Sequence, residues 1–295
     1  MDRDAPHVET PASDRIAGIG LEWILRPLFG VLLAIVALAA MVGGGAWFAV
    51  FIAAGTIAGV REWHRMLRHG GFLHYVFVSG IAIAAALALP VVQPQLFPAI
   101  SVPLLLSLEI LAAAAVINFA IAAAAKAGPV WQGFGPLYLG IPGLAVFALR
   151  AVPEHGLPLV LTLFMAVWAT DTGALIGGKL IGGPKMAPVL SPNKTWAGFA
   201  GGTLAGAAIA AAIMLAIGAN PVHGAVFGTV AALAAHGGDL FESWMKRGVG
   251  RKDSGHLIPG HGGVLDRIDS MLFAAPVCAA FVFLFGVHAV FGVQP

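Results

Sequence analysis

The stretch WAGFAGGTLAGAAIAAAIMLAIG, residues Trp196–Gly218, contains no charged side chain and is long enough to cross a bilayer as a helix, which takes roughly 20 apolar residues. Its many small residues let helix backbones approach closely, so we interpret them as packing residues. The other apolar runs are Pro27–Val42, Gly45–Val60, Phe72–Leu89, Ile100–Ala125, Trp131–Leu149, Leu157–Gly178, Val222–Leu240 and Met271–Val293. Together they predict an all-α fold, a polytopic integral membrane bundle of about nine transmembrane helices.

The composition also places the chain among membrane proteins. Hydrophobic residues make up 59% of its 295 residues and charged residues only 10%, whereas a soluble domain carries about 25% charged residues. The net charge of +2 is too small to indicate a nucleic-acid partner. The single cysteine, Cys278, excludes an intrachain disulfide and a zinc site built on cysteine pairs.

The positions of the basic residues predict the orientation of the helices. When alternate loops are assigned to opposite sides, all of the 16 Lys and Arg residues except Arg150 fall on one side. The positive-inside rule makes that side cytoplasmic, with the N-terminus inside and the C-terminus outside. We expect a cytoplasmic tail over residues 1–26, whose polar start is unlike a signal peptide. N-terminal transmembrane helices follow over 27–150, and C-terminal helices with a cytoplasm-facing catalytic site follow over 151–295.

Acidic residues in or beside the apolar runs are candidates for function, because a charge inside a membrane helix is costly. Asp171 either fixes helix packing or faces a polar cavity open to the cytoplasm. Asp239 and Glu242 are three residues apart and share one helix face, which Lys246 also joins. An ion pair with Lys246 accounts for Glu242 but leaves Asp239 unexplained. Glu109, near the middle of its run, either lines the cavity or pairs with a neighbouring helix.

A second pair of acids, Asp266 and Asp269, opens the last apolar run. Acids at a helix N-terminus are favoured by the helix dipole, so capping accounts for either residue alone. Two carboxylates on one face repel each other unless a cation lies between them. Hard divalent cations prefer such oxygen ligands, and Mg²⁺ typically takes one or two carboxylates together with substrate phosphates.

Two loops rich in basic residues and glycine lie on the predicted cytoplasmic side. The first contains Lys179, Lys185, Ser191 and Lys194 and leads into the helix that begins at Trp196. Such a turn before a helix N-terminus is an anion-binding site, although anionic lipid headgroups would account for its lysines about equally well.

The second loop lies within KRGVGRKDSGHLIPGHGGVLDRIDS, residues 246–270. Its basic residues, Lys246, Arg247, Arg251 and Lys252, can neutralise phosphates, and His261 lies in a glycine-rich turn where it would orient the loop or a phosphate. Carboxylates beside cations indicate a polyanionic substrate held through Mg²⁺, either a nucleoside triphosphate or a lipid phosphate. Phosphoryl-type transfer depends on positioning and charge neutralisation more than on a protein nucleophile.

The longest motif resembles that of a known family. SWMKRGVGRKDSGHLIPGHGGVLDRIDS, residues 243–270, resembles the pattern of phosphatidate cytidylyltransferases, also called CDP-diacylglycerol synthases, at every fixed position. DTGALIGGKLIG, SPNKTWAG and GDLFES resemble upstream elements of the same family. Asn193 and Ala197 stand where many members have Lys and Glu, so the resemblance implies no role for these two positions. The resemblance is strong over Ala169–Ser270, and over the first 150 residues it rests on hydropathy and length alone.

The resemblance implies that CTP and phosphatidate react to give CDP-diacylglycerol and diphosphate, a nucleotidyl transfer in phospholipid biosynthesis. It implies one or two Mg²⁺ ions, and a monovalent cation is a further candidate cofactor. It also implies a multi-pass protein of the bacterial cytoplasmic (inner) membrane, in contact with membrane lipids, and a homodimer.

Carried over residue by residue, the resemblance implies Asp239, Asp266 and Asp269 as metal ligands and catalytic residues. The other expected catalytic residues are Ser191, Lys194 and Arg267. The expected substrate-binding residues are Asp171, Lys179, Lys185, Glu242, Lys246, Arg247, Lys252 and His261.

Two other functions remain open from the sequence. A CTP-dependent kinase or nucleotidyltransferase that acts on another lipid, such as a polyprenol, would use the same residue types. A secondary transporter for an anionic solute would suit broken helices around GGKLIGG, although such transporters often show matched halves and the charged loops here are concentrated in the C-terminal half.

Overall fold

A computed structural model describes residues 28, 30–67, 72–92, 102–251, 253–255, 257 and 262–292. The helices are α2 (Gly45–Met66), α3 (Leu73–Val92), α4 (Val102–Ala124), α5 (Pro129–Arg150), α6 (Gly156–Leu180), α7 (Trp196–Ala216), α8 (Pro221–Gly248), α9 (Leu265–Phe285) and α10 (His288–Phe291), preceded by a shorter helix over Gly30–Gly43. The strands are β1 (Lys185–Ala187) and β2 (Ser191–Thr195). The expected tail, residues 1–26, lies outside the described residues.

The described chain is a helical bundle with the properties of a polytopic membrane protein. Seven of its described helices, α3 to α9, are long and apolar enough to cross a membrane. The expectation of a multi-pass helical fold is thus confirmed in its coarse form, while the number of spans and the orientation of the termini stay predictions.

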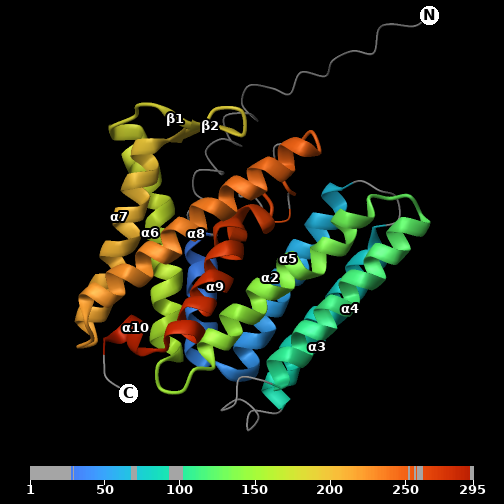
Figure 1. Ribbon diagram of the computed structural model, residues 1–295, viewed down its shortest axis with the longest axis horizontal. Coiled ribbons are helices and arrows are strands. Elements are labelled where there is room, and N and C mark those ends of the chain that lie inside the picture. The colour runs from blue at the N-terminus through green and yellow to red at the C-terminus, as the bar shows by residue number, and fades with distance from the viewer. Residues whose placement is uncertain are drawn as a thin grey trace, which may run out of the picture.

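The bundle has two groups of helices (Figure 1). Helices α2 to α5 pack on one another, and α6 to α9 form the second group. Contacts of α5 and α2 with α9, and of α5 with α6, join the groups. Helix α5 is the most enclosed of the seven apolar helices, with 78% of its apolar window buried. The helices that carry the C-terminal motifs therefore rest on α5 from the N-terminal group.

The small residues of α6 and α7 bring these helices into backbone contact. A Cβ atom added to Gly173 would lie 2.8 Å from the carbonyl oxygen of Gly201, and one added to Gly177 would lie 2.8 Å from that of Ala197. Only glycine fits at such an approach. The interpretation of the small residues in Trp196–Gly218 as packing residues is confirmed.

A buried polar network ties the N-terminal helices together. His64 of α2 contacts the side-chain oxygen of Gln132 on α5, and its Nε2 lies 3.2 Å from Ser79 Oγ on α3. Asn118 of α4 donates to the same serine oxygen at 2.9 Å. Hydrogen bonds of this kind hold membrane helices together at about 0.6 kcal/mol each, so this group forms a fixed support for the rest of the bundle.

A short antiparallel hairpin, which the sequence did not predict, lies in the loop between α6 and α7 of the helical bundle. Strand β1 pairs with β2, and Thr195 at the end of β2 also caps α7, because its Oγ1 accepts a hydrogen bond from the amide of Gly198 at 3.0 Å. The hairpin and the C-terminal end of α8 lie at the same end of the bundle, which we call the polar end (Figure 1).

The position of Glu109 favours neither of the roles considered for it. It lies on an exposed part of α4 and forms no ion pair with another described residue. The cavity and helix-pairing roles considered for it therefore find no support among the described side chains.

Candidate active site

Helices α8 and α9 meet at a glycine that has no room for a side chain. A Cβ atom on Gly238 would collide with the carbonyl oxygen of Asp269 and would lie 3.3 Å from Phe273 Cβ. On the same face of α8, Phe241 packs against Phe273 of α9, and its ring centroid lies 5.2 Å from that of Tyr138 on α5. These contacts fix the rotation of α8 and place Asp239, the residue after Gly238, beside α9.

Four carboxylates from three helices gather near this contact. They belong to Asp171 of α6, Asp239 and Glu242 of α8, and Asp269 of α9. Asp269 interacts electrostatically with each of the other three, and Ser270 Oγ donates to Asp171 Oδ1 at 3.3 Å. Four acids at such close quarters repel one another, so this group favours cations from the solvent or from the protein.

Glu242 is the most enclosed member of the group. Its side chain is fully buried, and neither carboxylate oxygen has a hydrogen-bond partner among the described residues. Its ion-pair partner is Lys246, one turn further along α8, whose Nζ lies 3.4 Å from Oε1. A buried carboxylate costs free energy unless it is compensated, so this side chain has spare capacity for a further cationic or donor group.

Two lysines already lie against the acids. Lys194 Nζ is 2.6 Å from Asp239 Oδ2, which joins β2 to α8. Lys246 Nζ is 2.8 Å from Asp266 Oδ1, which joins α8 to α9. One ammonium group beside the acids thus comes from the hairpin, and the other comes from the end of α8.

Asp266 has a different environment from Asp269. Its Oδ2 accepts hydrogen bonds from the amides of Ser254 and Gly263, both at 3.1 Å, in addition to the contact of Oδ1 with Lys246. It therefore fixes the loop before α9. Asp269 accepts a hydrogen bond from the adjacent amide of Ser270 at 2.7 Å and lies beside Glu242. The expectation that Asp266 shares a cation with Asp239 and Asp269 stays a prediction.

Glu62 of α2 is a residue of this region that the sequence analysis missed. Its side chain is buried, and Oε2 accepts hydrogen bonds from the amide of Leu265 at 2.8 Å and from Ser254 Oγ at 3.3 Å. Gly263 packs so closely that a Cβ atom there would lie 2.6 Å from Glu62 Oε2. The N-terminal group thus anchors the loop and the first turn of α9. The available signal was an acid at the end of an apolar run, with Arg61 and Arg65 beside it.

The remaining predicted residues lie around the polar end. Arg247 Nε donates to the carbonyl of Leu190 at 3.4 Å, which ties the end of α8 to the hairpin turn. Lys179 and Lys185 are exposed and form no ion pair with another described residue. Ser191 is half-buried at the start of β2.

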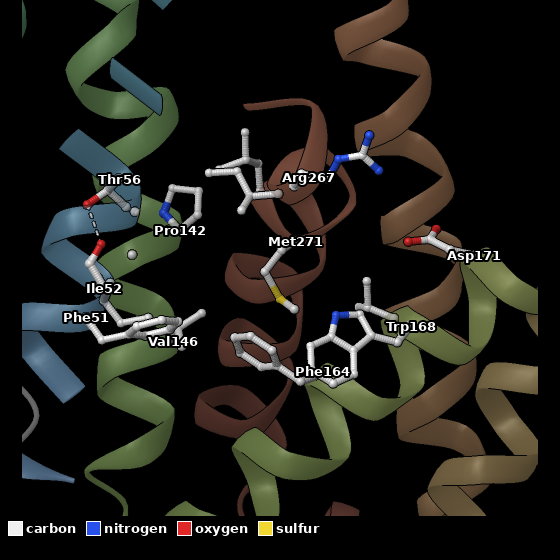
Figure 2. A pocket seen from close by; sticks show the side chains of 15 residues that line it. Phe51, Ile52, Thr56, Pro142, Val146, Phe164, Trp168, Asp171, Arg267 and Met271 are labelled. Carbon is white, nitrogen blue, oxygen red and sulfur yellow. Dashed lines mark hydrogen bonds between the residues drawn. The ribbon is translucent and has the colours of Figure 1, made fainter. Parts of the chain in front are cut away.

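Arg267 is exposed on the first turn of α9 and points to the rim of a neighbouring apolar pocket (Figure 2). Two other predicted residues, Lys252 and His261, lie outside the described residues.

The acids suit a metal ion that arrives with a phosphate ligand. Within the described ranges, no three His, Cys, Asp or Glu side chains are close enough to hold a metal ion by themselves. Mg²⁺, however, usually takes only one or two carboxylates and completes its shell with water and phosphate oxygens. The donor set of Asp239 and Asp269, with the buried carboxylate of Glu242 nearby, fits that requirement.

The chain is similar in sequence to proteins named for one activity. The phosphatidate cytidylyltransferase of Brucella suis biovar 1 (strain 1330) is 43% identical over 164 residues, which is 55% of this chain and 58% of that protein. The alignment thus leaves more than a third of the Brucella relative unmatched. The phosphatidate cytidylyltransferase of Staphylococcus aureus (strain COL) is 31% identical over 255 residues, 86% of this chain and 96% of that protein.

The model of the cytidylyltransferase family matches residues 24–285, which includes the supporting helices as well as the acids and lysines of the polar end. The chain belongs to the cytidylyltransferase family.

Proposed function

We propose that this protein is a phosphatidate cytidylyltransferase, which converts CTP and phosphatidate to CDP-diacylglycerol and diphosphate. The support is the juxtaposition of acids and lysines at one end of an apolar bundle, together with the activity named for its relatives. A polar site at the end of a membrane bundle can take a nucleotide from water and a phosphorylated lipid from the bilayer.

The proposed reaction forms one P–O bond and breaks another. A phosphate oxygen of phosphatidate attacks the α-phosphorus of CTP, and the bond from that phosphorus to the bridging oxygen of the β-phosphate breaks. Diphosphate leaves with the bonding electrons. The attacking phosphomonoester is already largely ionised at neutral pH, because its second pKa is about 6, so the site needs no protein nucleophile or strong base.

The chain's own residues would bind and orient the two phosphates. Asp239 and Asp269 would hold Mg²⁺, which when bound neutralises charge on the nucleotide phosphates and the leaving diphosphate. Lys194 and Lys246 would exchange part of their contact with the acids for phosphate oxygens. Arg267 would face the lipid phosphate from the first turn of α9.

We also propose that the polar end faces the cytoplasm of a bacterial cell, where CTP is made, and that the protein forms a homodimer in the inner membrane.

Asp171 and Glu242 would be the remaining acidic residues of the site.

The observation that carries the proposal is the backbone contact between α8 and α9 at Gly238 and Asp269, which places Asp239, the next residue of α8, beside α9. Asp269→Asn keeps the size of the side chain and removes its charge. We expect it to lower the formation of CDP-diacylglycerol by about 100-fold or more, the usual cost of losing a charge-stabilising group in an active site. Glu109→Gln, on exposed α4, is the matched control and should retain activity. Near-normal activity of Asp269→Asn in purified, folded protein would contradict the assignment.

A further inference from the structure

An apolar pocket lies between the two groups of helices, and Asp171, one of the four gathered acids, lines it. Its volume is about 140 Å³. It is lined by parts of α2, α5, α6 and α9, so each group of helices contributes a wall. Figure 2 shows the pocket with its labelled side chains.

The pocket is polar at one end and apolar at the other. The charged side chains of Arg267 and Asp171 lie at one end, whereas Phe51, Val146 and Phe164 line the other end (Figure 2). Thr56 offers no free donor to a ligand there, because its hydroxyl donates to the carbonyl of Ile52 at 2.7 Å. The deeper part of the pocket therefore suits a hydrocarbon chain.

We propose that this pocket holds the first part of one acyl chain of phosphatidate, with the lipid phosphate at the rim beside Arg267. The inference rests on the proposed function, which supplies a lipid with an anionic headgroup as substrate. Charge supports this occupant: the guanidinium group of Arg267 lies at the rim on the first turn of α9, where the helix dipole also favours an anion, and the Asp171 carboxylate at the same rim accepts a hydrogen bond from Ser270 Oγ. A second cation, Lys246 at the end of α8, pairs with Asp266 on the first turn of α9.

The size of the pocket limits how much of the chain it can hold. A protein cavity of about 150 Å³ lined by apolar side chains binds one benzene molecule. This pocket therefore accommodates roughly six carbons, and the rest of the chain would extend into the bilayer. Because a lipid tail gains little when it moves from the bilayer to an apolar pocket, the pocket would orient the headgroup toward the acids rather than add affinity in a membrane.

Gly55 gives a direct way to fill the pocket. It lines the cavity on α2, and no neighbouring heavy atom lies within 4 Å of the position that a Cβ atom would take. Gly55→Leu should therefore occupy the space without displacing a helix. The matched control is Ala54→Leu, which adds a side chain of the same kind to an exposed position on the same helix.

The test uses water-soluble phosphatidates that carry one acetyl chain and one chain of increasing length, assayed as monomers with CTP. Each methylene that leaves water is worth about a fourfold gain, so for the unmodified protein kcat/KM should rise by up to about fourfold per carbon and level off near six carbons. Gly55→Leu should flatten this rise and leave kcat/KM for the diacetyl substrate within about twofold. Met271→Ala, which enlarges the pocket, should extend the rise to longer chains.

The inference is overturned if Gly55→Leu and Met271→Ala keep the length profile of the unmodified protein and of Ala54→Leu. If the unmodified protein makes no CDP-lipid from any substrate, the proposed function fails instead. In that case a phosphatidate with a diazirine near the sixth carbon still tests the pocket by photolabelling. Labels on α2, α5 or α9 at the pocket, stronger than those from phosphatidylcholine with the same diazirine, support the inference. Equal labelling by the two lipids, or labels confined to α3 and α4, overturn it.

Discussion

Asp266 and Asp269 are neighbours on one helix face, yet their contacts differ. The first carboxylate is engaged by two loop amides and Lys246, and the second faces Asp171, Asp239 and Glu242. The sequence could place both acids at the start of a helix, because a glycine-rich turn before an apolar run is a local signal. It could not divide their roles, because the partners of each acid come from other helices and from the loop.

This difference predicts distinct effects of the two charge-removing substitutions. Asp266→Asn should lower thermal stability in detergent, because it weakens an ion pair with Lys246 and two amide hydrogen bonds, each worth about 1–3 kcal/mol when a charged acceptor is lost. Asp269→Asn should leave the melting temperature nearly unchanged and lower turnover by about 100-fold or more. Equal melting temperatures and equal activities for the two variants would contradict separate roles for Asp266 and Asp269.

Glu62 supports the site from outside the motif. Glu62→Ala leaves the amide of Leu265 and the hydroxyl of Ser254 without their acceptor. A buried donor without a partner costs about 1–3 kcal/mol, so we expect a lower melting temperature and at least a tenfold loss of activity. Glu109→Ala, an exposed acid in the same group of helices, is the control and should change neither quantity. Unchanged melting and activity in Glu62→Ala would contradict an anchoring role.

Among the elements, the contact between α8 and α9 sets the geometry of the acids. The sequence predicted only one side of this contact, because the three-residue spacing places Asp239 and Glu242 on one face of a helix. The close approach at Gly238 was not predictable, because Gly237 and Gly238 are identical residues in sequence and differ only in what faces them.

The two glycines therefore make a matched pair of variants. Gly238→Ala forces a methyl group against the backbone of Asp269, and overpacking of this kind typically costs about 1–3 kcal/mol. It should lower both the melting temperature and the activity. Gly237→Ala places the same methyl group 3.8 Å from Phe273 Cδ1, an ordinary contact, and should stabilise the helix by about 0.5–1 kcal/mol. Activity that survives in Gly238→Ala as well as it does in Gly237→Ala would contradict the role of this contact.

At the scale of the whole molecule, the sequence predicted the helical membrane bundle well. Apolar runs of sufficient length determine the fold class, since backbone hydrogen bonds must be satisfied within the segment in lipid. The β1–β2 hairpin and the support from Glu62 were missed, because both depend on contacts between distant parts of the chain. Of the candidate site, residue types and the acid-rich faces were predictable, whereas the pairing of Lys194 with Asp239 was not.

The proposed cation dependence requires the packing of the whole bundle, because the two ligands come from α8 and α9. Removal of divalent cations with EDTA should abolish turnover, and added Mg²⁺ should restore it, while the melting temperature of the free protein should change little because the described residues hold no complete metal site by themselves. Full activity in EDTA would contradict the assignment of Asp239 and Asp269 to a cation.

The most direct test of the account follows the α-phosphate of CTP. Purified protein is incubated with phosphatidate, Mg²⁺ and CTP labelled at the α-phosphorus, and the lipids are separated by chromatography. The account predicts that the label enters a lipid that also contains cytidine, with one diphosphate released for each molecule formed, and that Asp269→Asn forms none. Label that stays in water-soluble nucleotide while the γ-phosphate enters the lipid would identify a kinase and contradict the proposed reaction.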